Sequence, residues 1–592
     1  MRIVEGMLGL KLMAAAPAFG APCDVKTNLA AILCRVKEAK QKGAELLLLP
    51  QLCLTAQSGG DILAQPLLLD AAAHGAMKIA EASEGLLCVF GLPVMSGGRL
   101  YSLMLAARDG QFIACWQKPL QARFRDAENF SAEPAPLSFD IGGQTVPVYH
   151  DNPLSLPGRE DILLGLSMFG SQDSAAAAEK MARRGIHLAL FPSAEPALAS
   201  SAKARIMSLA QASWAGCLCL YANAGSNESS TDFVYDGMAL IAYRDNISAL
   251  AKPFSLDAAF AAYPFVSMEA VFSKGQAGEQ KVYPFAPRYG SDRDQAFGDD
   301  LVYPFAPSID KVQDEASVPD LAFPYAPPEG LQRVGWCRDA LEIGAQALAT
   351  RLRRIGAKCL TLGISGGLDS AMALMFACRA FGILGFDIAG ILPFALPGPG
   401  SSAHTRHSAR DLVEALGLTY REIDIAPSIQ LHLKEIGHSG RPDAAFENAQ
   451  ARERTQILMD LANMHDGLML GPGDMSELAL GFTTYGGDHM SMYNPNAGLY
   501  KSAIRMMIDQ AASDAQSAGL RDCLRAILAT PISPELLPSA SGEIVQRTEE
   551  IVGPYELIDF YLYHFLHKGH SSQELLGWRR RLLAASIQGK VC

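Results

Sequence analysis

Six consecutive residues, Ser365-Gly-Gly-Leu-Asp-Ser370, combine the groups that could hold a phosphate chain. Gly366 and Gly367 let backbone amides approach phosphate oxygens closely, and the hydroxyls of Ser365 and Ser370 add donors. Asp369 supplies a hard carboxylate oxygen of the kind that Mg²⁺ prefers, and a single carboxylate leaves room for water and phosphate. These residue types predict a pyrophosphate cradle, although a Gly-Ser loop in another context is an ordinary turn.

Two predicted elements flank this loop and decide between the cradle and the turn. The apolar run Cys359–Ile364 predicts a buried strand, and Ala371–Phe381 predicts an apolar helix. This order places the loop at a helix N-terminus, where the helix dipole favours an anion. The sequence therefore predicts a phosphate-binding loop in a strand–loop–helix unit.

Four further motifs follow the loop in a fixed order. They are Phe446–Gln456, Gly471–Gly481, Thr484–Asn494, and Ile532–Pro538 with Gly553–Leu557. Together with the loop, which resembles that of the ATP-pyrophosphatases, they closely resemble NAD synthetase. The resemblance implies that ATP adenylates the nicotinate carboxylate of deamido-NAD, and that ammonia then displaces AMP to give NAD. This chemistry suits the loop, because a carboxylate is a poor electrophile until its oxygen becomes part of a leaving group, and the departing pyrophosphate must be stabilised.

The same resemblance implies roles for single residues. Glu477 matches a metal ligand that would complement Asp369 in binding Mg²⁺, and Lys501 matches a lysine that contacts the phosphates of ATP. Five positions match residues that bind deamido-NAD, with Phe482 in place of an aromatic residue near the nicotinate ring: Asn448, Arg452, Phe482, Tyr485 and Asp488.

Each of these assignments has a structural alternative. Arg452 could belong to an ion-paired helix face that includes Glu447 and Gln456, since neighbours three or four apart meet on a helix. Lys501 could be a solvated side chain near a helix start, and Glu477 could stabilise a helix dipole only.

The synthetase half departs from the family at two places. Pro472 stands where a threonine is expected beside the ATP site, and proline removes both a hydroxyl and an amide donor. The chain ends at Cys592, where related enzymes continue into a basic tail, so we expect either Arg579-Arg-Arg581 to substitute or turnover to be slow. A catalytically impaired nucleotide-binding or regulatory homologue is therefore the alternative function. A ligase acting on a different carboxylate is a third, which the motif Phe446–Gln456 disfavours.

The first 255 residues alternate apolar runs with helical patterns, which predicts an α/β sandwich. The first helix is expected to be capped by Asn28 and to end at Gly43. Buried strands are predicted at Leu46–Pro50, Leu87–Phe90, Ile162–Leu166, His187–Phe191 and Leu218–Tyr221.

This part resembles the nitrilase-like glutaminase domain of glutamine-dependent NAD synthetases. The resemblance lies in Ala44–Thr55, in Tyr101–Leu103 near Gln117–Pro119, and in Ser230–Gly237. That family hydrolyses glutamine with a Glu, a Lys and a Cys. Gln51 stands at the Glu position and Ser167 at the Cys position, so only Lys118 is kept.

The two replacements make glutamine hydrolysis doubtful. An amide cannot accept a proton near neutral pH, and a serine without a base is a far weaker nucleophile than a thiolate. Ser167 would need a base such as Asp126 or Glu128, and we expect Cys217 and Cys219 to be core residues rather than replacement nucleophiles. We therefore hypothesise a retained scaffold that supports oligomerisation and the ammonia route, beside a synthetase that uses free ammonia.

A 20-residue repeat separates the two halves. Its copies are Tyr263-Pro-Phe, Tyr283-Pro-Phe-Ala-Pro, Tyr303-Pro-Phe-Ala-Pro and Phe323-Pro-Tyr-Ala-Pro. Proline removes ladder donors and favours extended structure, so the repeats predict a linker that packs aromatic residues along domain surfaces; docking of a partner is the alternative. The expected organisation is a nitrilase-like domain at 1–255, this linker at 256–330, and a Rossmann-like parallel-sheet ATP-pyrophosphatase domain at 331–592.

Composition limits the remaining function classes. The net charge of -12 among 592 residues disfavours a nucleic-acid or anionic-membrane surface. No stretch approaches about 20 uninterrupted apolar residues, and Glu5 and Lys11 interrupt the first apolar run, which predicts a buried strand rather than a signal peptide. The 12 cysteines show no metal or disulfide spacing. We expect a cytoplasmic homo-oligomer acting on small molecules, with ATP and Mg²⁺ as cofactors.

Overall fold

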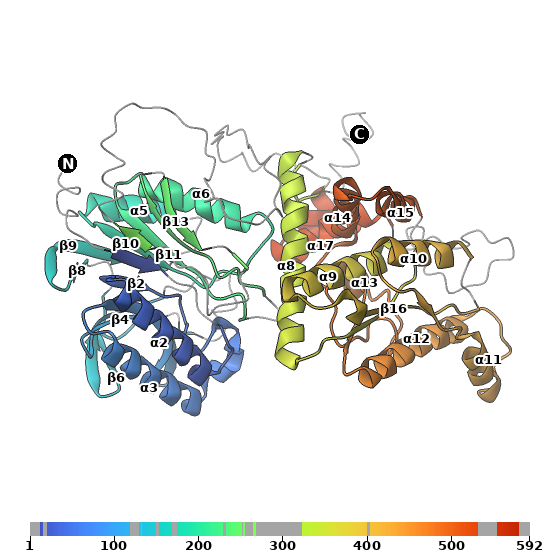
Figure 1. Cartoon of the computed structure of the whole chain (residues 1–592), viewed down its shortest axis with the longest axis horizontal. Helices are drawn as coiled ribbons and strands as arrows, with labels where there is room; N and C mark the ends of the chain where they lie inside the picture. The colour runs from blue at the N-terminus through green and yellow to red at the C-terminus, as the bar shows by residue number, and fades with distance from the viewer. Residues whose placement is uncertain are drawn as a thin grey trace. The chain divides into compact units, whose positions relative to one another are not determined.

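The computed structural model of the chain divides into two compact units, Met1–Pro304 and Phe305–Cys592 (Figure 1). It describes residues 12–15, 20–118, 130–131, 133–149, 153–168, 174–228, 233–244, 246–251, 253–254, 265–267, 323–328, 330–399, 403–530 and 553–578. Among these residues, no helix combines the length and the apolarity needed to cross a bilayer.

The first unit contains two six-stranded sheets. One sheet has the order β14-β1-β2-β3-β4-β5 and the other the order β13-β12-β11-β10-β9-β8. The strands of the first sheet are β1 (Leu12–Ala15), β2 (Leu46–Leu48), β3 (Leu87–Ser96), β4 (Arg99–Arg108), β5 (Gln111–Gln117) and β14 (Phe265–Ser267). Those of the second are β8 (Leu154–Leu156), β9 (Arg159–Leu166), β10 (Leu188–Pro192), β11 (Leu218–Ala222), β12 (Ala239–Tyr243) and β13 (Asn246–Ala251).

Alternation along the strands builds a four-layer sandwich. In β2, Leu46 and Leu48 point into a core shared with Leu188 and Leu218 of the other sheet, whereas Leu47 packs with the helices outside. This is the period of two that a strand imposes on its side chains. Helices α2 (Val25–Gln41) and α3 (Pro66–Ala82) cover the first sheet, and α5 (Ser174–Arg183) and α6 (Ser201–Ser213) cover the second. The predicted α/β sandwich is confirmed.

The start of α2 differs from the prediction. Asp24 caps the helix by accepting a hydrogen bond from the amide of Thr27, and Asn28 lies inside it, so the assignment of Asn28 as the cap is wrong. Asn28 is buried and its amide group bonds to Ala21 and Leu54, which ties the preceding loop to the strand side of the unit. Gly43 follows the helix end with a φ of 76°, as expected.

The second unit is built on a four-stranded sheet of order β17-β16-β15-β18, in which every neighbouring pair is parallel. The strands are β15 (Leu360–Gly363), β16 (Ile391–Ala395), β17 (Arg421–Glu422) and β18 (Leu468–Leu470). Its helices include α8 (Leu331–Ile355), α9 (Leu368–Leu384), α10 (Ala403–Ala415), α11 (Ala426–Glu435), α12 (Ala444–Met464), α13 (Met475–Leu480), α14 (Lys501–Asp514), α15 (Ala518–Ala529) and α17 (Tyr555–Leu562). The predicted Rossmann-like parallel sheet is confirmed.

The repeats are described only in part. Phe265, from the first copy, begins β14, which pairs antiparallel with β1. The fourth copy, Phe323–Pro327, is described before α8, and the copies that begin at Tyr283 and Tyr303 lie outside the described residues. The proposed boundaries at 255 and 330 stay predictions.

Candidate active site

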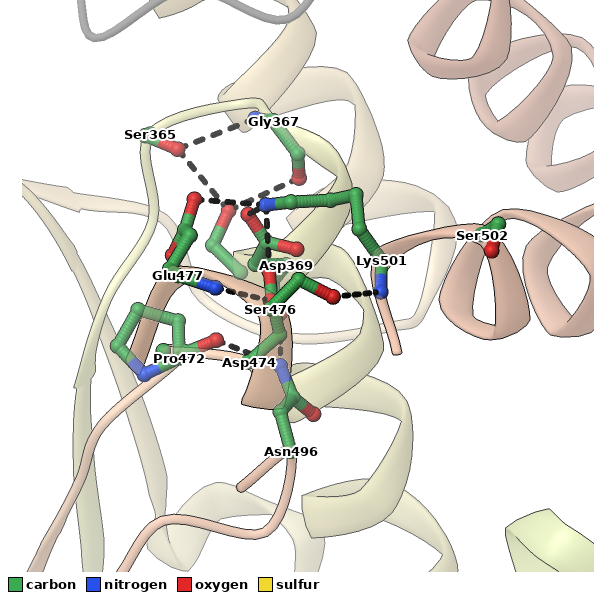
Figure 2. A network of polar contacts seen from close by, with 12 residues as sticks. Ser365, Gly367, Asp369, Pro472, Asp474, Ser476, Glu477, Asn496, Lys501 and Ser502 are labelled. Carbon is green, nitrogen blue, oxygen red and sulfur yellow. Dashed lines mark hydrogen bonds and ion pairs between the residues drawn. The ribbon is translucent and has the colours of Figure 1, made fainter. Parts of the chain in front are cut away.

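The phosphate loop lies between β15 and α9, as the sequence predicts. Gly367 is the N-cap of α9, so Asp369 falls in the first turn of that helix. Ser365 Oγ accepts a bond from the amide of Gly367 at 3.1 Å and lies 3.2 Å from Ser370 Oγ (Figure 2). Gly366 has a φ of 79°, and a Cβ there would lie 2.6 Å from the Thr405 carbonyl oxygen. The loop shape therefore requires glycine at this position.

A lysine and three carboxylates meet directly below this loop. Lys501 Nζ lies 2.7 Å from Asp369 Oδ2, 2.6 Å from Asp474 Oδ2 and 2.7 Å from Glu477 Oε1 (Figure 2). Lys501 is only 1% exposed, so the alternative of a solvated lysine is wrong. Glu477 stands in the first turn of α13 and also pairs with Lys501, so dipole stabilisation is not its only contact.

The charges in this cluster do not balance. Burial raises the pKa of Asp369 and of Glu477, and the neighbouring Asp474 raises both further, whereas Lys501 lowers both. Burial alone would lower the pKa of Lys501, but the carboxylates raise it well above its ordinary value. With all three carboxylates ionised, one ammonium would leave two negative charges, which a divalent cation would neutralise.

The geometry of the cluster fits a divalent cation. One ligand atom from each of Asp369, Asp474 and Glu477 lies within 4.8 Å of the others. Asp369 Oδ1 is buried and has no hydrogen-bond partner among the described residues. Hard carboxylate oxygens are the ligands that Mg²⁺ prefers, and three of them leave room for water or phosphate.

Hydrogen bonds at three helices, α13, α14 and α17, hold the cluster in place. Asp474 is the N-cap of α13, and its Oδ1 accepts the amide of Glu477 at 2.9 Å. The amide of Lys501, the first residue of α14, donates to Ser476 Oγ at 3.0 Å. Asp559 on α17 accepts from Ser476 Oγ at 2.5 Å and from the amide of Ser502 at 2.9 Å. The lysine is thus fixed through its backbone as well as its side chain.

Asn496 joins the two loops of the site. Its side-chain amide donates to the carbonyl of Asp369 at 2.9 Å and to the carbonyl of Pro472 at 2.8 Å (Figure 2). Pro472 lacks a hydroxyl and an amide donor, but its carbonyl oxygen still takes part in the loop-to-loop contact.

The residues predicted to bind the dinucleotide fall into one group. Asn448 and Arg452 lie on α12; Asn448 Oδ1 accepts from Thr484 Oγ1 at 3.1 Å, and Arg452 Nε donates to the carbonyl of Tyr485 at 3.1 Å. Asp488 Oδ1 accepts the amide of Thr484 at 2.7 Å.

Two aromatic members of this set differ in exposure. Tyr485 is 87% exposed, which leaves its ring open to a ligand, whereas Phe482 is half-buried and its amide donates to the carbonyl of Glu477 at 3.0 Å. Phe482 therefore connects the loop after α13 to the end of that helix, beside the carboxylate cluster.

A cavity of about 390 Å³ adjoins the cluster on the side of α14 and α17. Its walls include Leu368, Lys501, Arg505, Thr530 and Tyr555. It places an arginine and a lysine on one surface next to the loop.

Sequence reasoning missed three members of this site: Asp474, Asn496 and Asp559. Asp474 had a readable signal, since an aspartate three residues before Glu477 is a capping pattern at a helix start. Asn496 and Asp559 had none, because they reach the site from residues 127 and 83 positions away.

In the first unit, the three degenerate glutaminase positions follow strand ends. Gln51 comes after β2, Lys118 after β5 and Ser167 after β9. Gln51 Nε2 donates to the carbonyl of Pro192 at 2.8 Å, and the amide of Ser167 donates to that of Leu190 at 2.9 Å. Strand β10 therefore brings Gln51 and Ser167 to one end of the sandwich.

Both replaced side chains are buried. Gln51 is 4% exposed and Ser167 is 6% exposed, and neither Gln51 Oε1 nor Ser167 Oγ has a hydrogen-bond partner among the described residues. Lys118 is half-buried. Asp126 and Glu128, the candidate bases for Ser167, lie outside the described residues.

Cys217 and Cys219 are core residues. Both are fully buried and pack with Leu209 and Leu240 in the core beneath α5 and α6. Burial raises the pKa of the Cys217 thiol to about 12, so it is not a ready thiolate. The expectation that they are core residues is confirmed.

Fold and site together define the class of protein: an ATP-using ligase built on a parallel Rossmann-like sheet and joined to a nitrilase-like sandwich. The NAD synthase family matches residues 341–586. A glutamine-dependent NAD(+) synthetase of Mycobacterium leprae (strain TN) is 31% identical over 573 residues, which cover 92% of this chain and 82% of that protein. The chain therefore belongs to the NAD(+) synthetase family, whose members form a C–N bond with ATP.

Other relatives match one or both units. An NH(3)-dependent NAD(+) synthetase of Trichlorobacter lovleyi is 30% identical over 250 residues, 41% of this chain and 82% of that protein. Among solved structures, a glutamine-dependent NAD(+) synthetase from Cytophaga hutchinsonii aligns with a TM-score of 0.69 at 18% identity, covering 95% of this chain and 87% of that one. This last similarity supports the fold alone.

Proposed function

We propose that this NAD synthetase takes its nitrogen from free ammonia. The observation behind the proposal is that Gln51 and Ser167 occupy the positions of the glutaminase base and nucleophile. Gln51 is bonded to a backbone carbonyl, and Ser167 Oγ has no partner among the described residues that could remove its proton. Full-length relatives are glutamine-dependent, so this chain would have kept their fold and lost their ammonia supply.

Each group of synthetase residues around the ATP site has its own role. The amides and hydroxyls of Ser365–Ser370, with the α9 dipole behind them, hold the phosphates of ATP. Mg²⁺ held by Asp369, Asp474 and Glu477 would neutralise charge on the pyrophosphate as it leaves. Lys501 turns its ammonium group from the carboxylates to the phosphates of ATP. Beside the ATP site, Pro472 leaves its carbonyl bonded to Asn496.

Residues of α12 and of the loop that follows α13 position deamido-NAD. Arg452 and Asn448 hold that loop through Tyr485 and Thr484, and the exposed Tyr485 ring offers a stacking surface. Asp488 fixes the loop backbone, and Phe482 lines the side next to the nicotinate ring. With the carboxylate adenylated there, ammonia attacks the acyl carbon, loses a proton and expels AMP.

Steady-state NAD formation with one nitrogen source at a time tests the proposal. With ammonium we expect turnover; with ammonium-free glutamine we expect a rate at least about 10²-fold lower, since a general base alone contributes 10²–10⁴-fold. Equal rates would show that the first unit still hydrolyses glutamine. Release of AMP and pyrophosphate from ATP plus deamido-NAD separates a working ligase from an impaired nucleotide-binding homologue, which would show affinity alone.

We also propose that the protein works in the cytoplasm as a homo-oligomer. The 11 cysteines among the described residues are all free thiols, which suits a reducing compartment. Light scattering on the purified full chain measures its mass in solution, and a mass of 63.3 kDa would contradict the oligomer.

A further inference from the structure

The fourth copy of the repeat packs onto the synthetase unit immediately beside the catalytic cluster. The ring of Tyr325 stacks on Tyr500 with centroids 4.6 Å apart and planes at 29°. Trp336 and Tyr563 flank it at 6.4 and 6.2 Å. We call Trp336, Tyr500 and Tyr563 the aromatic site. Tyr500 directly precedes Lys501, so the occupant of this site lies behind the lysine of the active site.

Polar contacts hold the same segment at its middle and at its end. Ser502 Oγ donates its hydrogen to Asp559, so the hydroxyl of Tyr325, which lies against Ser502 Oγ, must be the donor in that pair. Arg333 Nε donates to the carbonyl of Pro327 at 2.9 Å, and its guanidinium lies 5.4 Å from the ring centroid of Phe323. The first, third and fifth residues of the motif are therefore all contacted.

These contacted positions recur in the chain. Tyr283–Pro287 and Tyr303–Pro307 have the same pattern of aromatic, proline, aromatic, alanine, proline, and the copies start 20 residues apart. They are identical to each other and differ from Phe323–Pro327 by exchanging the two aromatic residues, so that phenylalanine stands in the middle. The first copy, at Tyr263, has Val-Ser in place of Ala-Pro, and its Phe265 pairs in the sheet of the first unit.

We propose that the aromatic site is a docking site for this pentapeptide, and that Tyr303–Pro307 exchanges with Phe323–Pro327 as its occupant. A proline-rich segment is already extended before it binds, so aromatic surfaces accept it at low entropic cost. The tether keeps the second copy at a high local concentration. Exchange would add 20 residues to the loop before α8, so the linker length would change in steps of one repeat.

The middle residue sets the balance between the two occupants. Tyr325 gives Ser502 a hydrogen bond that a phenylalanine cannot give, and a bond of this kind corresponds to a preference of about fivefold. Phe323–Pro327 is therefore the main occupant, and a Tyr325→Phe substitution would remove most of its advantage while keeping the ring.

Photo-crosslinking in the full-length protein tests the exchange. A benzophenone amino acid at position 563 reports the occupant, because digestion and mass spectrometry distinguish residues 303–307 from 323–327. In the otherwise unchanged chain we expect crosslinks mainly to 323–327. Tyr325→Phe should raise the share of 303–307 about fivefold, and Tyr325→Ala should make 303–307 the main product.

Position 565 provides the matched control. Phe565 is 55% exposed and lies two residues from the reporter, so a benzophenone there measures chance encounters with the linker. Crosslinks to 303–307 that stay at this control level in all three chains would overturn the proposal. Since the readout is not activity, it does not depend on which nitrogen source the synthetase uses.

Discussion

At the residue scale, Lys501 explains why three acidic side chains can lie together in a nearly dry site. Its ammonium lies within 2.7 Å of an oxygen of each of them, and these ion pairs offset part of their mutual repulsion. Asp369 Oδ1 has no hydrogen-bond partner among the described residues, so it remains available to a cation.

Asp474→Asn isolates the charge of the one carboxylate that the sequence did not reveal. Asparagine caps helices as well as aspartate, so α13 should stay intact. We expect ammonium-driven NAD formation to fall at least about 10²-fold, because a metal ligand is lost. Electron paramagnetic resonance should show weaker Mn²⁺ binding with ATP present.

Asp443→Asn is the matched control, since Asp443 also caps a helix, α12, by accepting the amides of Ala445 and Phe446. It lies outside the carboxylate cluster, so turnover and Mn²⁺ binding should both be kept. Wild-type turnover in Asp474→Asn would remove this residue from the metal site.

At the scale of elements, local patterns were readable and long-range contacts were not. The glycine pair and the apolar run before it predicted β15, the loop and α9, because each signal lies within a few residues of the next. Asp559 could not be predicted, since only packing of α17 against α13 and α14 brings it to Ser476 and Ser502. The error at Asn28 has the same origin, because its partners in the loop and at Leu54 come from tertiary structure.

A buried ion pair fixes the ends of β10 and β12 around α6. Arg205 on α6 pairs with Asp236 and with Glu195. The side chain of Arg205 is 4% exposed and that of Asp236 is 0% exposed. Asp236 also accepts from Asn223 Nδ2 at 2.8 Å and from the amide of Met238 at 3.0 Å. Such a network stabilises a fold only while every member is present.

Asp236→Ala should therefore destabilise the first unit by about 3–5 kcal/mol, because it leaves Arg205 buried without its main partner. Denaturant unfolding followed by a probe in that unit measures the loss. Asp161→Ala removes the partner of Arg159 in a surface pair and should leave the unfolding midpoint unchanged. Equal midpoints for the two variants would contradict the role given to the buried network.

At the scale of the whole molecule, one unit brings Asp369, Asp474, Glu477 and Lys501 together, and the other carries Gln51 and Ser167 at two positions that the sequence predicts to be catalytic in the family. The two identified replacements, Gln51 and Ser167, still lie at the strand ends where the fold would present a base and a nucleophile. The polar oxygens that remain there are buried without partners among the described residues. Unpaired buried polar groups cost stability, so removal of one that has no catalytic role should stabilise the first unit.

Ser167→Ala tests whether Ser167 has a catalytic role. The substitution removes a buried hydroxyl that has no partner in the described part of the chain, so the first unit should become more stable by about 1 kcal/mol, or roughly 2–4 °C in its unfolding midpoint. Ser83→Ala is the matched control: it removes a buried hydroxyl that donates to the Ala80 carbonyl at 2.6 Å, so the same midpoint should fall.

Ammonium-driven turnover should be unchanged in Ser167→Ala, because ammonia supplied from solution does not require Ser167. If Ser167 were a nucleophile, its loss would also leave the ammonium rate unchanged but would abolish a glutamine-driven rate that the unsubstituted chain shows. Measuring both rates in this one variant therefore distinguishes an inactive glutaminase unit from one that uses the Ser167 hydroxyl as its nucleophile.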